Sequence, residues 1–200
     1  MIPDPEGILK HLGAEAASAA ARPDCGGAAR VPVLCGDLDM RIDREGVWHY
    51  RGSPIGRKPL VRLFSTVLRR EGDGTYWLVT PAERGRIVVE DAPFMAVALD
   101  ASGAGRAQSL RFRTNVDDEV VAGKGHPIRV VHDPVTGEPR PYVLVRDRLE
   151  ARIARPVYYE LVALGACECL AGRSHYGVWS GGVFFPLGRP DGDCPETPCP

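Results

Sequence analysis

Short strand-like segments, separated by glycine and proline turns, fill most of this chain and restrict it to folds built from small sheets. Apolar residues alternate with charged ones over residues 38–42, and residues 47–50 follow a turn at Arg44, Glu45 and Gly46. This alternation has the period of a half-buried strand, so the two segments predict a hairpin. Similar segments recur at residues 76–79, 86–89, 94–99, 110–113, 128–132, 142–145, 149–153 and 176–187. They predict antiparallel sheets connected by short turns.

Two amphipathic helices are expected among these strands. From Pro59 to about Arg70 the apolar residues follow the spacing of one helical face, and glycines at 72 and 74 end the segment. A second, shorter helix is expected from Pro156. Each half then has strands, a helix entered through Arg and Pro, and an aromatic strand after the helix. We therefore predict an α+β protein of two related small domains, each an antiparallel sheet with one main helix.

The expected domain boundaries follow from composition. Residues 33–105 and 106–188 should form the two domains, joined at the Ala-Ser-Gly-Ala-Gly sequence of residues 101–105. Residues 1–32 predict an N-terminal helix and a linker. Residues 189–200 contain four prolines and no apolar periodicity, which predicts a disordered tail.

The charge balance and the absence of long apolar runs exclude several classes of partner. The chain has 25 basic and 26 acidic residues, whereas non-specific binding to nucleic acid requires a surplus of positive charge. No stretch approaches the roughly 20 apolar residues of a membrane span, and residues 1–4 lack the basic start of a signal peptide. We expect a cytoplasmic protein that binds neither nucleic acid nor a membrane.

The six cysteines form no recognisable metal or disulfide motif. The chain contains no C-x-x-C pair, and a helix would point Cys167 and Cys169 to different sides. Structural zinc needs four convergent ligands, so no metal site is expected. Reduced thiols are predicted for a cytoplasmic protein, and no motif indicates a cofactor.

The loop at residues 52–59 is the most distinctive candidate for binding. It carries two glycines and leads into the helix that begins at Pro59, but its glycine spacing is not that of a Walker loop. Lys58, directly before this helix, cannot provide the acceptor that a Ser, Thr, Asp or Asn cap would. An anion could therefore bind its open amides, together with Arg57, Lys58 and Arg62. Capping by water and a neighbouring loop is the alternative.

A polar cluster follows the strand at residues 110–113. Thr114, Asn115 and Asp117 offer acceptors to ribose hydroxyls or base edges, or they close Asx turns. The adjacent carboxylates of Asp117 and Asp118 need not converge, so they do not predict acid–base catalysis. No Ser or Cys lies in a nucleophile motif. The sequence therefore does not predict an enzyme, and a hydrolase is the third hypothesis after two binding functions.

Several segments together resemble the bacterial family called domain of unknown function 1285. They are residues 35–42 (CGDLDMRI), 52–57 (GSPIGR), 63–64 (LF), 69–74 (RREGDG), 76–81 (YWLVTP) and 112–115 (FRTN). The resemblance implies a duplicated core, a C-terminal domain like a pleckstrin-homology fold, and a nucleotide-type ligand site between the domains in a signalling role. Residues 52–58, 80–81 and 112–117 are the family-like segments that map onto this interface. They add Ser53, Gly56, Thr80 and Arg113 to the expected site.

The leading hypothesis is a non-enzymatic protein that binds a nucleotide-like anion at the interdomain interface. Arg57, Lys58 and Arg62 would bind phosphate, while Thr114, Asn115 and Asp117 would bind polar parts of the ligand. The alternative is an interaction module whose pleckstrin-like domain binds a partner peptide by strand addition or in a groove. The oligomeric state stays open.

Overall fold

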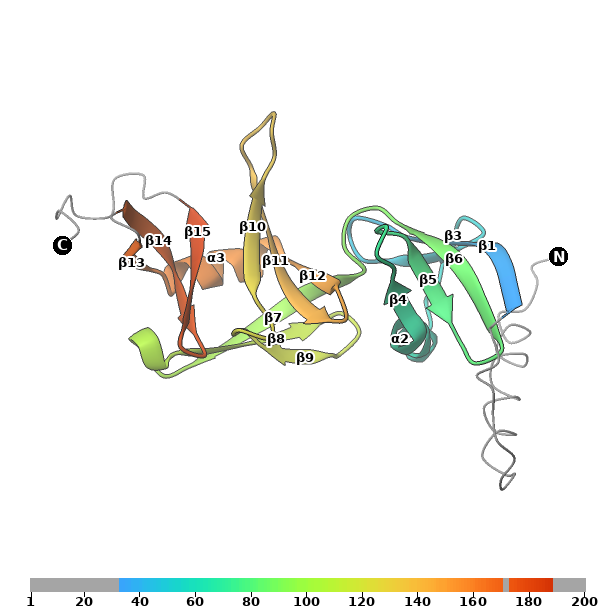
Figure 1. The fold of residues 1–200 in the computed structure, drawn as a ribbon, viewed down its shortest axis with the longest axis horizontal. Helices are drawn as coiled ribbons and strands as arrows, with labels where there is room; N and C mark the ends of the chain where they lie inside the picture. Colours follow the sequence, from blue (N-terminus) through green and yellow to red (C-terminus); the bar gives the residue numbers. More distant parts are fainter. Residues whose placement is uncertain (1–32, 171–172, 189–200) are drawn as a thin grey trace, which may run out of the picture.

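The computed structural model describes residues 33–170 and 173–188, and it consists of two sheet-rich halves placed end to end (Figure 1). The first half forms one six-stranded sheet, and the second forms a six-stranded and a three-stranded sheet. Two α-helices accompany the sheets in the described residues. The fold is therefore mostly sheet with two helices. The predicted N-terminal helix and C-terminal tail lie outside the described residues.

The first sheet packs against the helix α2 (Lys58–Val67). Leu60 and Phe64 lie on the buried side of this helix, and Phe64 stacks on Trp48 with ring centroids 6.2 Å apart. These residues have the predicted helical spacing, which places them on one face. The strands of this sheet are β1 (Val33–Ile42), β2 (Trp48–Tyr50), β3 (Ser53–Pro54), β4 (Leu68–Arg70), β5 (Tyr76–Val79) and β6 (Glu83–Val89).

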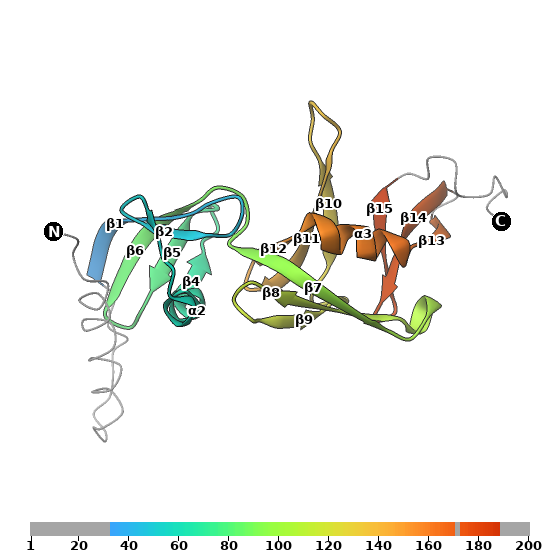
Figure 2. The same ribbon diagram turned by 180° about the vertical axis from the view of Figure 1, so that it is seen from behind.

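The second half closes two sheets around one core. Its larger sheet contains β7 (Phe94–Ser102), β8 (Ser109–Thr114), β9 (Glu119–Val121), β10 (Ile128–His132), β11 (Pro139–Arg146) and β12 (Leu149–Ile153), with a short 3-10 helix at Gly105–Ala107. Its smaller sheet contains β13 (Ala166–Leu170), β14 (Arg173–Ser180) and β15 (Val183–Gly188). The helix α3 (Arg155–Ala163) connects the two sheets and contacts β7 and β14 (Figure 2).

A buried serine joins these two sheets. The hydroxyl of Ser180 accepts a hydrogen bond from the Leu110 amide at 2.9 Å and donates one to the Ala122 carbonyl at 2.7 Å. Phe112 and Val178 are fully buried between the sheets. The serine therefore satisfies two backbone groups that would otherwise be buried without partners.

The two six-stranded sheets share one topology. Their orders are β3-β2-β1-β6-β5-β4 and β9-β8-β7-β12-β11-β10, so each joins two antiparallel three-stranded units. The units meet through a parallel pair, β1 with β6 in the first sheet and β7 with β12 in the second. The prediction of purely antiparallel sheets was therefore wrong. Local sequence periodicity reports that a strand exists, but not the direction of a partner far along the chain.

The helices take different places in the two repeats, and the domains divide earlier than predicted. The helix α2 lies between β3 and β4, whereas α3 follows β12, so the similar Arg-Pro helix entries are not equivalent positions. The chain leaves the first sheet after Val89 and enters the second at Phe94. Residues 101–105, predicted as the joint, instead form the end of β7 and the start of its connection to β8, because the same small residues suit a linker and a hairpin.

The cysteines also differ from expectation. Cys167 and Cys169 lie in β13 rather than in a helix, and both are disulfide-bonded. Thiol titration of the unfolded, unreduced protein should therefore find fewer than the six thiols of the sequence. Six free thiols would contradict the disulfide bonding of these two cysteines.

Neither of the two described helices is both long and apolar enough to span a membrane.

Candidate functional site

The side chain of Asn115 links the two domains. Its Nδ2 donates to the Gly46 carbonyl at 3.0 Å, in the turn between β1 and β2. Its Oδ1 accepts from the Met95 amide of β7 at 3.1 Å, and its own amide donates to the Met95 carbonyl at 2.8 Å. Asn115, predicted as a ligand contact, therefore holds the first domain's turn against the second domain.

Gly46 is required for this approach. It has a φ of +76°, and a Cβ at this position would lie 2.9 Å from Asn115 Nδ2. We expect Gly46→Ala to lower the free energy of unfolding by about 2 kcal/mol, because the alanine strains the backbone and displaces Asn115. The control Gly52→Ala, at φ +78° with nothing within 4 Å, should cost about 1 kcal/mol. Equal losses in urea unfolding would show that the Asn115 contact contributes nothing.

The basic residues at the start of α2 face a carboxylate of the second domain. Lys58 Nζ lies 2.9 Å from Asp117 Oδ1, and Arg62 Nη1 lies 3.3 Å from Asp117 Oδ2. The hydrogen bond from Lys58, with the charges of Lys58, Arg62 and Arg113, lowers the pKa of the Asp117 carboxyl despite some desolvation. Asp117 therefore occupies the place where the sequence predicted an external anion.

This contact depends on the ionised carboxylate. Because the pKa of Asp117 in the folded protein lies below its ordinary value of about 3.9, the contact stabilises the joint fully above that pH. The contribution is lost as the pH falls through the lower value of the folded state. The ionised carboxylate of Asp117 is consequently one of the contacts between the two domains at neutral pH.

Further contacts complete the joint. Arg146 of β11 donates from Nη2 to the Ser65 carbonyl of α2 at 2.7 Å, pairs with Asp118, and lies over the Phe94 ring with 5.0 Å to its centroid. On the neighbouring strand, Glu150 lies 4.0 Å from Arg70 of β4. These contacts fix the first domain against the tips of two hairpins in the second.

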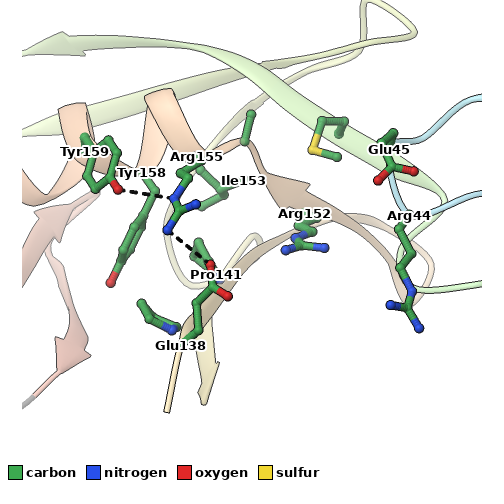
Figure 3. A pocket seen from close by; sticks show the side chains of 12 residues that line it. Arg44, Glu45, Glu138, Pro141, Arg152, Ile153, Arg155, Tyr158 and Tyr159 are labelled. Atoms are coloured by element: carbon green, nitrogen blue, oxygen red, sulfur yellow. Dashed lines mark hydrogen bonds and ion pairs between the residues drawn. The ribbon is translucent and has the colours of Figure 1, made fainter. Parts of the chain in front are cut away.

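A groove of about 540 Å³ opens beside this joint (Figure 3). The turn between β1 and β2 contributes Arg44 and Glu45, and the second domain contributes the rest of the lining. The second-domain residues are Met95, Glu138, Pro139, Pro141, Arg152, Ile153, Ala154, Arg155, Tyr158 and Tyr159. The volume lies within the range of small-molecule sites, roughly 300–1,000 Å³.

Asp43 shapes the wall that the first domain contributes. Its carboxylate accepts from the amides of Glu45 at 3.1 Å and Val47 at 2.9 Å, and it lies 2.7 Å from Nε2 of His49. Desolvation opposes ionisation of Asp43, but the bonds from His49 and the two amides outweigh it and lower the pKa of Asp43. These bonds fix the turn that presents Arg44 and Glu45.

The groove combines an apolar lining with polar groups that have spare bonding capacity. The side chain of Arg44 makes no hydrogen bond or ion pair with the described residues that surround it. Arg152 donates from Nη1 to Asp91 at 3.1 Å, and a guanidinium has five N–H groups in all. Arg155 lies 3.4 Å from Glu138 and donates to the Tyr159 hydroxyl at 3.2 Å (Figure 3). Burial raises the pKa of Tyr158, so its phenol stays protonated at neutral pH.

The structure separates the residues predicted as one site. Lys58, Arg62, Arg113, Asn115 and Asp117 gather at the joint. Thr114 is buried, and its hydroxyl accepts from the Asp118 amide, so it closes the β8–β9 turn. Thr80 bonds Glu83 at the end of β6 that pairs with Val33, away from the crossing to β7. Ser53 in β3 is exposed, as are Gly56 and Arg57 between β3 and α2.

Sequence reasoning did not identify the main residues of the groove. Arg44 stands in a correctly predicted turn, but nothing local indicates that it meets Arg152 and Tyr158 across the joint. The one feature of the sequence that could have indicated this groove was the second helix that begins with proline. Ala154 caps its beginning without a side-chain hydrogen bond, as Arg57 does for α2.

Fold and groove thus define a two-domain, sheet-rich protein with a concave site at its joint. Residues 30–92 match the family model "Domain of unknown function (DUF1285), N-terminal domain". Residues 93–187 match "Protein of unknown function (DUF1285), C-terminal domain". The chain belongs to the DUF1285 family, which confirms the resemblance found in its sequence. The two models meet in the same segment where the chain passes between the sheets.

Two solved structures of this family are similar to the chain. A DUF1285 protein from Silicibacter pomeroyi DSS-3 is 50% identical, with a TM-score of 0.74 over 87% of this chain and 94% of its own. A second, from Shewanella baltica OS155, is 24% identical, with a TM-score of 0.50 over 64% of this chain and 91% of its own. The second likeness concerns the fold alone. No curated protein is significantly similar to the chain.

Proposed function

We propose that this protein binds a nucleotide-like anion at the interface between its domains and serves in signalling. The groove that both domains build is the observation that carries this proposal. Arg44 from the first domain and Arg152 from the second bind phosphate oxygens, which suit the planar fork of a guanidinium. The site is therefore complete only when the two domains are in contact.

The rest of the groove fits the other parts of a nucleotide. Tyr158 and Tyr159 provide aromatic surface for a base, and the carboxylate of Glu45 accepts from ribose hydroxyls or base amino groups. The start of α3, whose N-cap residue Ala154 makes no side-chain hydrogen bond, adds positive potential to the part of the groove that Ala154 and Arg155 line. This combination of apolar surface and few polar groups is typical of small-ligand sites.

Calorimetric titration with AMP, ADP, GDP and cyclic AMP tests this proposal. We expect at least one of them to bind, and we expect Arg44→Ala and Arg152→Ala each to weaken it by about ten- to a hundredfold. The losses follow from removing one charge-assisted contact in each variant. No binding by the wild type across the panel would reject the proposal.

Lys58→Ala and Arg57→Ala distinguish the groove from the start of α2. Lys58 is already paired with Asp117, so we expect its replacement to change the nucleotide affinity less than about twofold. The same holds for Arg57, which does not line the groove. A large loss in these variants, with none in Arg44→Ala, would place the phosphate at the start of α2, where the sequence predicted it.

A second candidate function is peptide binding by the C-terminal domain, which we propose to be pleckstrin-homology-like. The strand β13 favours it, because β13 is the edge of the three-stranded sheet and pairs only with β14 among the described strands. An edge strand can accept an added strand through backbone hydrogen bonds. Slower hydrogen exchange at β13 on adding selected peptides, in a protein that binds no nucleotide, would favour this function.

A further inference from the structure

Asp91 lies in the short segment that carries the chain from β6 to β7. Its carboxylate accepts a hydrogen bond from the Tyr142 hydroxyl at 2.7 Å and one from Arg152 Nη1 at 3.1 Å. Its side chain is 17% exposed. Asp91 therefore holds a groove residue, Arg152, from a position on the interdomain segment itself.

The contacts of Asp91 extend to the first domain. The guanidinium of Arg129 lies over the Tyr142 ring with 4.3 Å to its centroid, and it pairs with Glu150 at 2.5 Å. Glu150 in turn lies 4.0 Å from Arg70 of β4. A continuous set of polar contacts thus runs from the groove through the interdomain segment to the first sheet.

Of the two side chains that donate to Asp91, Arg152 is the one that can exchange this carboxylate for another acceptor. Burial and the neighbouring Asp91 raise the pKa of Tyr142 to about 12, so the phenol keeps its proton and donates to Asp91 at neutral pH. Arg152 donates to the Asp91 carboxylate. Its side chain also lines the groove (Figure 3). A phosphate in the groove offers the same kind of acceptor as the carboxylate.

We propose that Asp91 is a positioning residue that competes with the ligand's phosphate for Arg152, and that it thereby couples occupancy of the groove to the interdomain joint. This inference rests on the proposed function, because it requires an anion in the groove. The two effects are thermodynamically linked. A change that weakens the contact between Asp91 and Arg152 strengthens ligand binding, and ligand binding weakens that contact. Two substitutions should change the affinity in opposite directions.

Asp91→Asn removes the competing charge but keeps the shape and an acceptor for Tyr142. We expect it to bind ADP about fivefold more tightly than the wild type. Tyr142→Phe removes the hydroxyl that also donates to Asp91, so Asp91 should bind Arg152 more strongly and ADP should bind more weakly.

Glu90→Gln is the matched control: this neighbouring carboxylate pairs with Arg41 in the first domain and does not line the groove. It should leave the ADP affinity unchanged.

Calorimetry with ADP and with neutral adenosine separates the possible outcomes. The proposal expects opposite changes for ADP in the two variants and little change for adenosine. Equal changes for ADP and adenosine would mean that Asp91 only shapes the groove, which overturns the coupling. Wild-type binding of ADP that neither variant alters overturns the coupling alone. No binding of AMP, ADP, GDP or cyclic AMP by the wild type overturns both the coupling and the proposed function.

Discussion

Leu161→Ala should lower the free energy of unfolding by about 2–5 kcal/mol, which is the usual cost of replacing a fully buried leucine by alanine. Leu161 is 0% exposed and, with Val157, forms the buried side of α3. The same helix presents Arg155, Tyr158 and Tyr159 to the groove. Because the variant loosens the support of these residues, we expect weaker ADP binding as well. Urea unfolding and calorimetry measure the two effects.

Leu164→Ala is the control, since this leucine is 37% exposed at the end of the same helix. It removes the same atoms from a position that buries less apolar surface, so its cost should stay near or below about 1 kcal/mol. Equal losses in the two variants would contradict the packing of α3 described above.

Arg146→Met should cost about 2–3 kcal/mol, because it removes charge-assisted hydrogen bonds between the domains. The Ser65 carbonyl and the Asp118 carboxylate would lose their shared donor. The methionine keeps apolar contact with the Phe94 ring, so the change isolates the polar contribution. We expect the loss in urea unfolding, with the two domains beginning to unfold in separate transitions.

Arg111→Met provides the comparison for this effect. Arg111 pairs with Glu119 at 3.3 Å on an exposed part of the second sheet, with more than half of each side chain accessible. Exposed pairs of this kind contribute little, and the variant should change the unfolding free energy by less than about 0.5 kcal/mol. If both arginine variants behaved alike, Arg146 would not fasten the domains.

Local periodicity explains which elements were predictable. The helix α2 was predicted because Leu60 and Phe64 have helical spacing and are buried on one face. Leu68 continues that spacing, yet it belongs to β4, because α2 ends at Val67. A single buried residue fits either period at the boundary between a helix and a strand, so the helix was expected to extend further than it does.

Pairing across the chain explains what was missed. The parallel contact of β1 with β6 joins strands separated by five other elements, and no local pattern indicates it. The same limit applies to the site: Asp117 meets Lys58 from the other domain, and Arg44 shares a groove with Arg152. The sequence did indicate a basic helix start at an interdomain interface, but not that a carboxylate of the protein already occupies it.

A crystal structure of the protein with ADP bound would test the proposed site most directly. The proposal predicts the diphosphate within hydrogen-bond distance of Arg44 and Arg152, with the adenine ring against Tyr158. ADP bound at Lys58 and Arg62 with Asp117 displaced, or bound outside the joint altogether, would contradict it.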